Sequence, residues 1–107
     1  MIVRITRARV RPRNEAAAFG ILRTVAASTP KPDGVDSLHI ARRAMADGDE
    51  LVAVTVWRDL EALQSLMGSD FQKPGFVPEL DQLLEDVTVD LYETIVDQFE
   101  GLEAIAT

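Results

Sequence analysis

Residues 35–57 read VDSLHIARRAMADGDELVAVTVW, two extended and largely apolar runs separated by an Asp-Gly pair. We expect a long strand over Val35–Ala46 and a returning strand over Leu51–Trp57. Gly48 accepts the positive φ that tight reverse turns require, so the pair Asp47-Gly48 predicts a hairpin between the two strands. The second run is nearly continuous in apolar residues, which is typical of a central strand buried on both faces.

A strand and a helix are expected before this hairpin. Met1–Val10 interleaves apolar residues with arginines, which predicts a strand that Pro12 ends. Asn14 can accept hydrogen bonds from the free amides of a helix start, so we expect a helix over residues 15–28. Two prolines and a glycine in Ser28–Gly34 then form a loop. The helix residues expected to face the core are Phe19, Leu22, Val25 and Ala26.

Two short helices and a closing strand are expected after the hairpin. Asp59 can cap a helix over Leu60–Met67, and Gly68 ends it. A proline suits a first helical turn, so another short helix is expected over Pro78–Leu84. Apolar and polar residues then alternate over Asp86–Val96, which predicts a strand. The residues expected to face inward are Leu60, Leu63, Leu66, Met67, Leu80, Leu83, Leu84, Val87, Val89, Leu91 and Ile95.

The expected order of elements is β-α-β-β-α-β. This order predicts an α+β domain of the ferredoxin-like class, with a four-stranded antiparallel sheet and both helices on one face. In the usual layout of this fold the last strand lies beside the first. A length of 107 residues fits one domain. We place that domain at residues 1–97 and expect a C-terminal tail at residues 98–107.

Charge is divided unevenly along the chain. Residues 1–43 hold nine basic and three acidic side chains, whereas residues 44–107 hold two and fifteen. We expect the two sets to pair across strands, where opposite charges contribute roughly 0.2–1 kcal/mol each. The net charge of −7 argues against nucleic acid as a partner. The side chains expected to face one another are Arg4, Arg7 and Arg9 on the first strand and Asp86, Asp90, Glu93 and Asp97 on the last.

The residue types present exclude several kinds of site. The chain has no cysteine and one histidine, which rules out disulfides, thiolate metal sites and histidine metal clusters. Its glycines are scattered and form no phosphate-binding loop. No apolar run reaches the roughly 18 residues of a membrane span, and the first residues lack the apolar centre of a leader peptide. We expect a cytoplasmic protein with no metal, no cofactor and no membrane partner.

The sheet face that the helices leave uncovered needs a cover of its own. The central strand is apolar on both sides, and leaving such a face in water costs about 25 cal/mol per Å². We therefore expect two copies of the chain to pack through their sheets as a homodimer.

Four stretches of the chain carry a family signal. They are residues 2–12, residues 34–43, residues 54–63 (VTVWRDLEAL) and the closing strand around residues 91–93. Together they resemble the antibiotic biosynthesis monooxygenase (ABM) family of the dimeric α+β barrel superfamily. The resemblance implies two sheets packed face to face across a dimer, with a pocket in each subunit between the sheet and the helices.

The resemblance also implies a choice of chemistries. Some members of the family oxygenate polycyclic aromatic substrates without metal or flavin, and others bind and degrade haem. The haem-degrading branch uses an asparagine on the first strand and a tryptophan and a histidine on the second helical region. Here Thr6 and Leu66 fall at the first two positions, and Phe71–Leu84 contains no histidine. Haem degradation is therefore disfavoured.

Trp57 and His39 are the candidate catalytic residues. Trp57, the only tryptophan, could stack on a flat substrate and orient an oxygen with its N–H, or it could close the end of the core. His39, the only histidine, could deprotonate a phenol to give an anion that reacts with O₂, or it could be a packing residue. A one-residue slip in register would move His39 to the other face of the sheet.

Further residues are candidates for binding a substrate. Arg4 and Thr6 share a face of the first strand and could hold an anionic group, although a cross-strand ion pair also accounts for Arg4. Tyr92, the only tyrosine, could bind through its ring and hydroxyl or simply pack on the sheet. Phe71 and Phe76 could line the mouth of a pocket or anchor their loop.

Two functions of different classes follow. The first is a small cofactor-independent monooxygenase that oxidises an aromatic or polycyclic small molecule, and the resemblance favours it. The second is a non-catalytic dimer of the same fold that binds a small molecule or has a structural role. The enzyme predicts a cavity of a few hundred Å³ with convergent polar groups beside Trp57.

Overall fold

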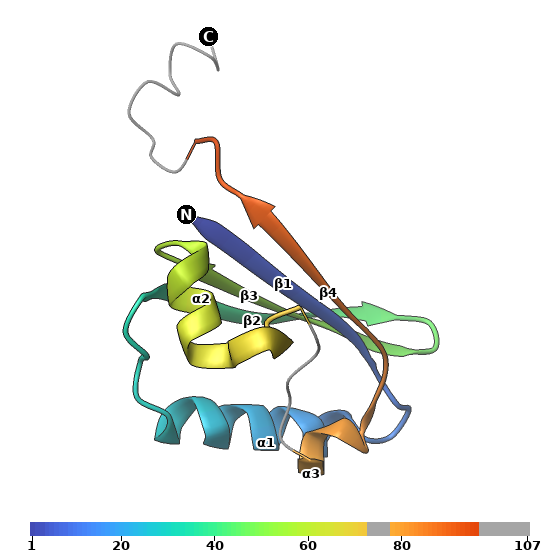
Figure 1. Cartoon of the computed structure of the whole chain (residues 1–107). Coiled ribbons are helices and arrows are strands. Elements are labelled where there is room, and N and C mark those ends of the chain that lie inside the picture. Colours follow the sequence, from blue (N-terminus) through green and yellow to red (C-terminus); the bar gives the residue numbers. More distant parts are fainter. Residues whose placement is uncertain (73–77, 97–107) are drawn as a thin grey trace, which may run out of the picture.

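The structure is a computed structural model that describes residues 1–72 and 78–96. Its strands and helices follow the expected β-α-β-β-α-β order, and the short helix predicted before the last strand is also present (Figure 1). The elements are β1 (Ile2–Val10), α1 (Glu15–Ser28), β2 (Val35–Met45), β3 (Gly48–Trp57), α2 (Leu60–Met67), the 3₁₀ turn η1 (Gly68–Asp70), α3 (Pro78–Asp81) and β4 (Leu84–Glu93).

The four strands form one antiparallel sheet in the order β2-β3-β1-β4. The last strand lies beside the first, as the ferredoxin-like layout predicts, and β2 is an edge strand. The helices lie on one side of the sheet (Figure 1). The chain therefore has the ferredoxin-like α+β fold.

Each sheet face carries alternate residues of every strand. We call the side that packs against the helices the helix face and the other side the outer face. On the helix face, Ile2 lies opposite Trp57 and Ala8 opposite Leu51. The central residues of the outer face are Val3, Ile5, Val52, Val54 and Val56, which are only partly covered in the single chain. The expected burial of β3 on both faces would thus require a further layer of protein against the outer face.

Two core clusters lie under the helix face. The first joins α1 and α3 to the sheet, and the second joins α2 to the opposite end of β1 and β3. Their fully enclosed members contribute roughly 1.5–3 kcal/mol each through burial. The first cluster is Ala8, Val10, Ala18, Leu51, Leu80 and Leu84, and the second is Val35, Trp57, Ala62 and Leu63.

The hairpin turn lies one residue earlier than the Asp-Gly pair predicts. Met45 pairs with Gly48, so the turn residues are Ala46 and Asp47, and β3 begins at Gly48 rather than at Leu51. Gly48 has φ +124°, and a Cβ there would meet the Val10 carbonyl oxygen at 2.8 Å. Cross-strand ion pairs extend the ladder to the turn, with Arg42–Asp49 at 3.2 Å and Arg43–Glu50 at 2.8 Å.

The last strand begins earlier and ends earlier than its alternation predicts. Pairing starts at Leu84, which we had expected in the preceding helix, and α3 is correspondingly shorter. A register shift opposite Arg7–Arg9 and a positive φ of 54° at Asp86 mark a β-bulge, which lets the ladder continue through this residue. Ile95 lies beyond the strand and is 97% exposed, so its expected inward position is wrong.

The helices bury narrower stripes than expected. In α1 the fully buried residue is Ala18, whereas Val25 and Ala26 are exposed. In α2, Ala62 and Leu63 are buried, whereas Leu60 and Leu66 are exposed. Asp59 caps α2 as predicted by accepting from the Ala62 amide at 2.8 Å, but Asn14 makes no side-chain cap on α1.

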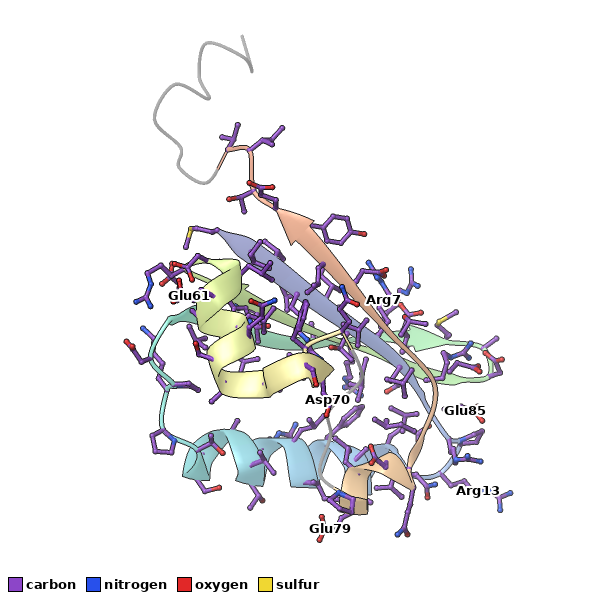
Figure 2. All side chains as sticks on the ribbon, in the orientation of Figure 1. Arg7, Arg13, Glu61, Asp70, Glu79 and Glu85 are labelled. Atoms are coloured by element: carbon purple, nitrogen blue, oxygen red, sulfur yellow. The ribbon has the colours of Figure 1, made fainter. Side chains whose placement is uncertain are left out.

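The charged residues of β1 are paired only partly as expected. Arg7 binds Asp90 of β4 at 2.9 Å (Figure 2), and Arg11 lies 3.9 Å from Glu85. Arg9 instead binds Asp47 in the hairpin turn. Asp97, Phe76 and the expected tail at 98–107 lie outside the described residues.

Candidate functional site

A hollow in the described part of the chain lies between α1, the loop that follows it and the helix face of β2 and β3. Its volume is about 610 Å³. One side is the α1 stripe Leu22, Val25 and Ala26, and the floor includes Thr55 and Trp57. The remaining wall residues are Thr29, Pro30, Lys31, Pro32, Val35, Asp36, Ser37, Leu38, Ile40 and Leu66.

Apolar side chains dominate this hollow although many of them are open to solvent. Val25, Leu38, Ile40 and Leu66 are 37%, 48%, 38% and 57% exposed, and all four line it. Exposed large apolar residues are ordinary when they are scattered, but a cluster of them marks a binding surface. This hollow therefore has the character of a small-molecule site, which is typically concave and mostly apolar.

Trp57 forms part of the floor and also belongs to the second core cluster. It is 4% exposed. Its indole Nε1 donates to the Thr55 hydroxyl at 2.9 Å, and that hydroxyl lies 3.5 Å from the Arg4 carbonyl oxygen. Because the indole has a single N–H, this bond occupies the donor that was expected to orient an oxygen. Trp57 thus lines the hollow without offering it a free polar group.

A second hollow of about 360 Å³ continues the first along α1. The two share Leu22, Ala26 and Ile40, and we call the joined hollows the α1 trough. Arg42 lies over the Phe19 ring here, with its guanidinium carbon 4.9 Å from the ring centroid. The other residues that line this second part are Arg23, Ala41 and Leu51.

His39 and Tyr92 lie on the outer face, away from the trough. His39 pairs with Val54 and Tyr92 pairs with Val3. A register shift between Val35 and Ser37 produces this result, because the extra residue moves the following side chains of β2 to the opposite faces. One subunit therefore does not bring His39 and Trp57 together.

Arg4, Thr6 and Phe71 come together, but beneath the surface. The Arg4 Nε donates to the Phe71 carbonyl at 3.1 Å, and its Nη1 donates to the Thr6 hydroxyl at 3.3 Å. Both β1 side chains are buried, and burial lowers the pKa of the Arg4 guanidinium, which nonetheless stays charged at neutral pH. Neither residue lines the trough as the described residues form it. The contacts tie the segment after η1 to the sheet.

Most residues that line the trough were not named as site candidates from the sequence. Apolar and hydroxyl side chains such as Leu38, Ile40 and Thr55 carry no unusual chemistry. Only the alternation along β2 and β3 could have placed these three on the same face of the sheet. Arg42 was assigned to a strand without a role. The apolar stripe of α1 could have indicated the trough. The predicted elements include none that would cover the C-terminal half of this stripe.

Two absences apply to the described part of the chain. Over residues 1–72 and 78–96 no group of three or more metal-ligating side chains gathers in one place. Over the same ranges no helix is long and apolar enough to cross a membrane.

Comparison with known structures agrees with the fold. The structure is similar to SnoaB, a cofactor-independent oxygenase from Streptomyces nogalater, with 21% identity and a TM-score of 0.65 over 90% of this chain and 94% of that one. It is similar to the haem-degrader MhuD from Mycobacterium tuberculosis, with 15% identity and a TM-score of 0.66 over 92% and 99%. It is also similar to Rv0793 from Mycobacterium tuberculosis, with 25% identity and a TM-score of 0.63 over 90% and 96%.

Two findings concern the amino-acid sequence of the chain. Among curated proteins no sequence matches the chain. The family profile described as antibiotic biosynthesis monooxygenase matches residues 1–73, which is more than half of the chain. The chain therefore belongs to the antibiotic biosynthesis monooxygenase family.

Proposed function

We propose that the protein is a cofactor-independent monooxygenase that oxidises a flat aromatic or polycyclic small molecule bound in the α1 trough. The observation that carries the proposal is the group of solvent-open apolar side chains around this trough, with Trp57 among its lining residues. Membership of the family supports the reaction class, and the similarity to SnoaB supports the absence of a cofactor.

The proposed reaction balances with the substrate as the only reductant. A reduced ring carbon of the CH₂ type loses two hydrogens and gains one oxygen atom of O₂ as a carbonyl. The other oxygen atom leaves as water with those two hydrogens. The substrate gives four electrons and O₂ accepts four, so no metal or flavin is required. An electron-rich anion formed by loss of the first proton is the species that reacts with O₂.

The trough would contribute binding and exclusion of water. Its apolar walls remove a flat ring system from water, which stabilises the complex by about 25 cal/mol per Å² of apolar surface. Thr55 and Trp57 are held by their mutual hydrogen bond, so the floor is rigid before the substrate arrives. A rigid, dry site favours the orientation that the reaction needs.

We propose further that the protein works as a homodimer through the outer face. The stripe Val3, Ile5, Val52, Val54 and Val56 is open in the single chain, and flanking ion pairs such as Arg7–Asp90 border it. A second copy would cover this stripe. Sedimentation at low micromolar protein should find twice the mass of the chain, and a stable single subunit would overturn this part.

Haem is a poor fit to the trough. Haem iron in proteins is held by histidine, cysteine, methionine or tyrosine side chains. The chain has no cysteine, and its single histidine and single tyrosine, His39 and Tyr92, lie on the outer face. None of the three methionines, Met1, Met45 and Met67, is among the described residues that line the trough. Titration with haemin should therefore give no Soret shift typical of axial ligation.

One observation favours a second function, binding without catalysis. The floor of the trough offers no free acid or base, because the Trp57 donor is occupied and His39 is on the other face. The one carboxylate among the described residues that line it, Asp36, lies at the end that Lys31 also lines. A substrate whose own acidity supplies the anion would still react. A ligand without that acidity would only be bound.

The test is oxygen uptake with anthrone-type and hydroquinone substrates. Leu66→Asp places a charge in the trough wall, and Leu60→Asp places the same charge on an exposed α2 residue that does not line it. We expect Leu66→Asp to lower kcat/KM at least about tenfold, equivalent to about 1.4 kcal/mol, and Leu60→Asp to leave it nearly unchanged. Equal effects of the two substitutions would refute the trough as the site.

His39→Ala separates two placements of the reaction. If the reaction occurs in the trough, the variant keeps its rate, because His39 faces away from it. A loss of rate in this variant with normal Leu66→Asp activity would instead place the chemistry on the outer face between subunits. Tight ligand binding without oxygen uptake by the wild-type protein would establish the second function.

A further inference from the structure

The basic side chains of the first 43 residues fall into two groups in the folded chain. Arg7, Arg9, Arg11 and Arg43 each pair with a carboxylate, as the uneven charge of the sequence predicts. Arg23 behaves differently. Among residues 1–72 and 78–96 no ion pair involves it, although it lines the trough.

Arg42 is the second cation at this end of the trough. Its guanidinium lies over the Phe19 ring, and its Nη1 is 3.2 Å from an oxygen of Asp49. This one contact leaves the other N–H donors of the fork available for a ligand. Asp49 compensates one positive charge, so Arg23 and Arg42 together leave one in excess. No carboxylate is among the residues that line this part of the trough.

The excess charge lies beside apolar side chains. Phe19, Leu22, Ala26 and Ile40 line the same hollow as the two arginines. Both arginines are exposed, the Arg42 side chain to 63%, so water and salt screen their charge. Arginine also binds a carboxylate in a bidentate geometry and stacks on aromatic rings. Since the chain as a whole carries −7, this positive end is a local exception.

The trough is elongated along α1. The α1 residues that line it are 19, 22, 23, 25 and 26, which span seven helical steps, or about 10 Å at 1.5 Å per residue, and Thr29 and the loop after the helix extend the trough further. The opposite end has both a cation and an anion, Lys31 and Asp36, which balance each other. The two ends therefore differ in charge.

We propose that the α1 trough selects aromatic acids, with the ring system on the apolar walls and a carboxylate or phenolate at Arg23 and Arg42. This specificity deepens the proposed function, on which it rests for its substrate class. It requires no turnover and can be measured as binding.

The experiment compares two ligands of equal shape, anthracene-2-carboxylate and anthracene-2-carboxamide, by fluorescence polarisation at neutral pH. We expect the wild-type protein to bind the carboxylate about tenfold more tightly. Arg23→Gln and Arg42→Gln should each weaken binding of the carboxylate about threefold or more and leave the carboxamide nearly unchanged. Higher salt should weaken only the carboxylate.

Two further variants separate the effect of the guanidinium shape from that of charge and control for the loss of an arginine outside the trough. Arg42→Lys retains the charge without the planar fork and should restore part of the preference. Arg13→Gln removes an exposed arginine that precedes α1 and does not line the trough (Figure 2), and it should change neither affinity. Thermal unfolding checks that each variant is folded.

The outcomes distinguish this inference from the proposed function. Equal affinities for the two ligands, or a preference that survives both arginine substitutions, would overturn it. A carboxylate preference that depends on Arg23 and Arg42, found in a protein that consumes no oxygen, would support the inference while the monooxygenase proposal failed.

Discussion

The two halves of α1 are both largely apolar but differ in what covers them. Residues 15–21 read EAAAFGI and residues 22–28 read LRTVAAS. In the first half Ala18 is fully buried against Val10, Leu80 and Leu84. In the second half Val25 and Ala26 stay exposed beside Ile40. An apolar stripe becomes core only where another element closes over it, and elsewhere it becomes the wall of a trough.

The largest expected effect is the difference in stability lost when a buried leucine and an exposed leucine are each replaced by alanine. Leu80→Ala removes a side chain that is 2% exposed and should lower the free energy of unfolding by about 2–5 kcal/mol. Leu38→Ala, in the trough, should lower it by less than about 1 kcal/mol because that side chain is already half in water. Urea unfolding of both variants checks the difference. Similar losses would mean that the trough is closed in solution.

The next effect is a loss of stability in the loop that follows the exposed C-terminal half of α1. Gly34 has φ +85°, and a Cβ there would lie 2.6 Å from the Ala62 Cβ. Gly34→Ala should therefore cost about 1–3 kcal/mol of stability. Gly20→Ala is the matched control within α1, where no atom lies within 4 Å, and it should stabilise by roughly 0.5–1 kcal/mol. Thermal melts of the pair should move in opposite directions.

A smaller effect distinguishes the starts of α1 and α2. Asp59 accepts the Ala62 amide at 2.8 Å, so Asp59→Ala should cost about 1 kcal/mol. Asn14 makes no side-chain cap, and Asn14→Ala should cost much less. Equal losses in chemical unfolding would show that α1 is capped in solution after all.

The smallest effect is the pH dependence of the stability that Asp47 contributes at the hairpin turn. The hydrogen bond from Arg9, with a backbone hydrogen bond and the Arg9 charge, lowers the pKa of the Asp47 carboxyl. A lowered folded-state pKa stabilises the fold at pH values above the unfolded value of about 3.9, and this contribution disappears as the pH falls through the folded pKa. Arg9→Gln should raise the pKa of Asp47 toward its ordinary value in an NMR titration, whereas Arg13→Gln should not.

Much of the fold could be predicted because it depends on local patterns. The apolar runs predicted β1, β2 and β3, and Asp59 with Gly68 predicted both ends of α2. The start of β4 was wrong by two residues, because the bulge at Asp86 lets the ladder run through a residue whose own preference is for a turn. A bulge depends on the partner strand, which the local sequence does not contain.

The site was predictable only in part for the same reason. Trp57 was expected beside a pocket, and it lies in the floor of the trough. His39 was expected to act with it, but the register shift after Val35 puts the two on opposite faces. Without that extra residue, His39 would share the face of Val35 and Trp57. No composition or spacing within β2 reveals the shift.

The amino-acid sequence by itself determined the strands and helices, their order, the exclusion of thiol and histidine-cluster chemistry, and the resemblance to the family, because these depend on residue types and short spacings. Only the tertiary structure decided which apolar residues are sealed, which arginines are paired and which face His39 occupies. These properties depend on contacts between segments far apart in the chain. A shift of one residue in strand register is enough to move a side chain such as His39 to the opposite face of the sheet.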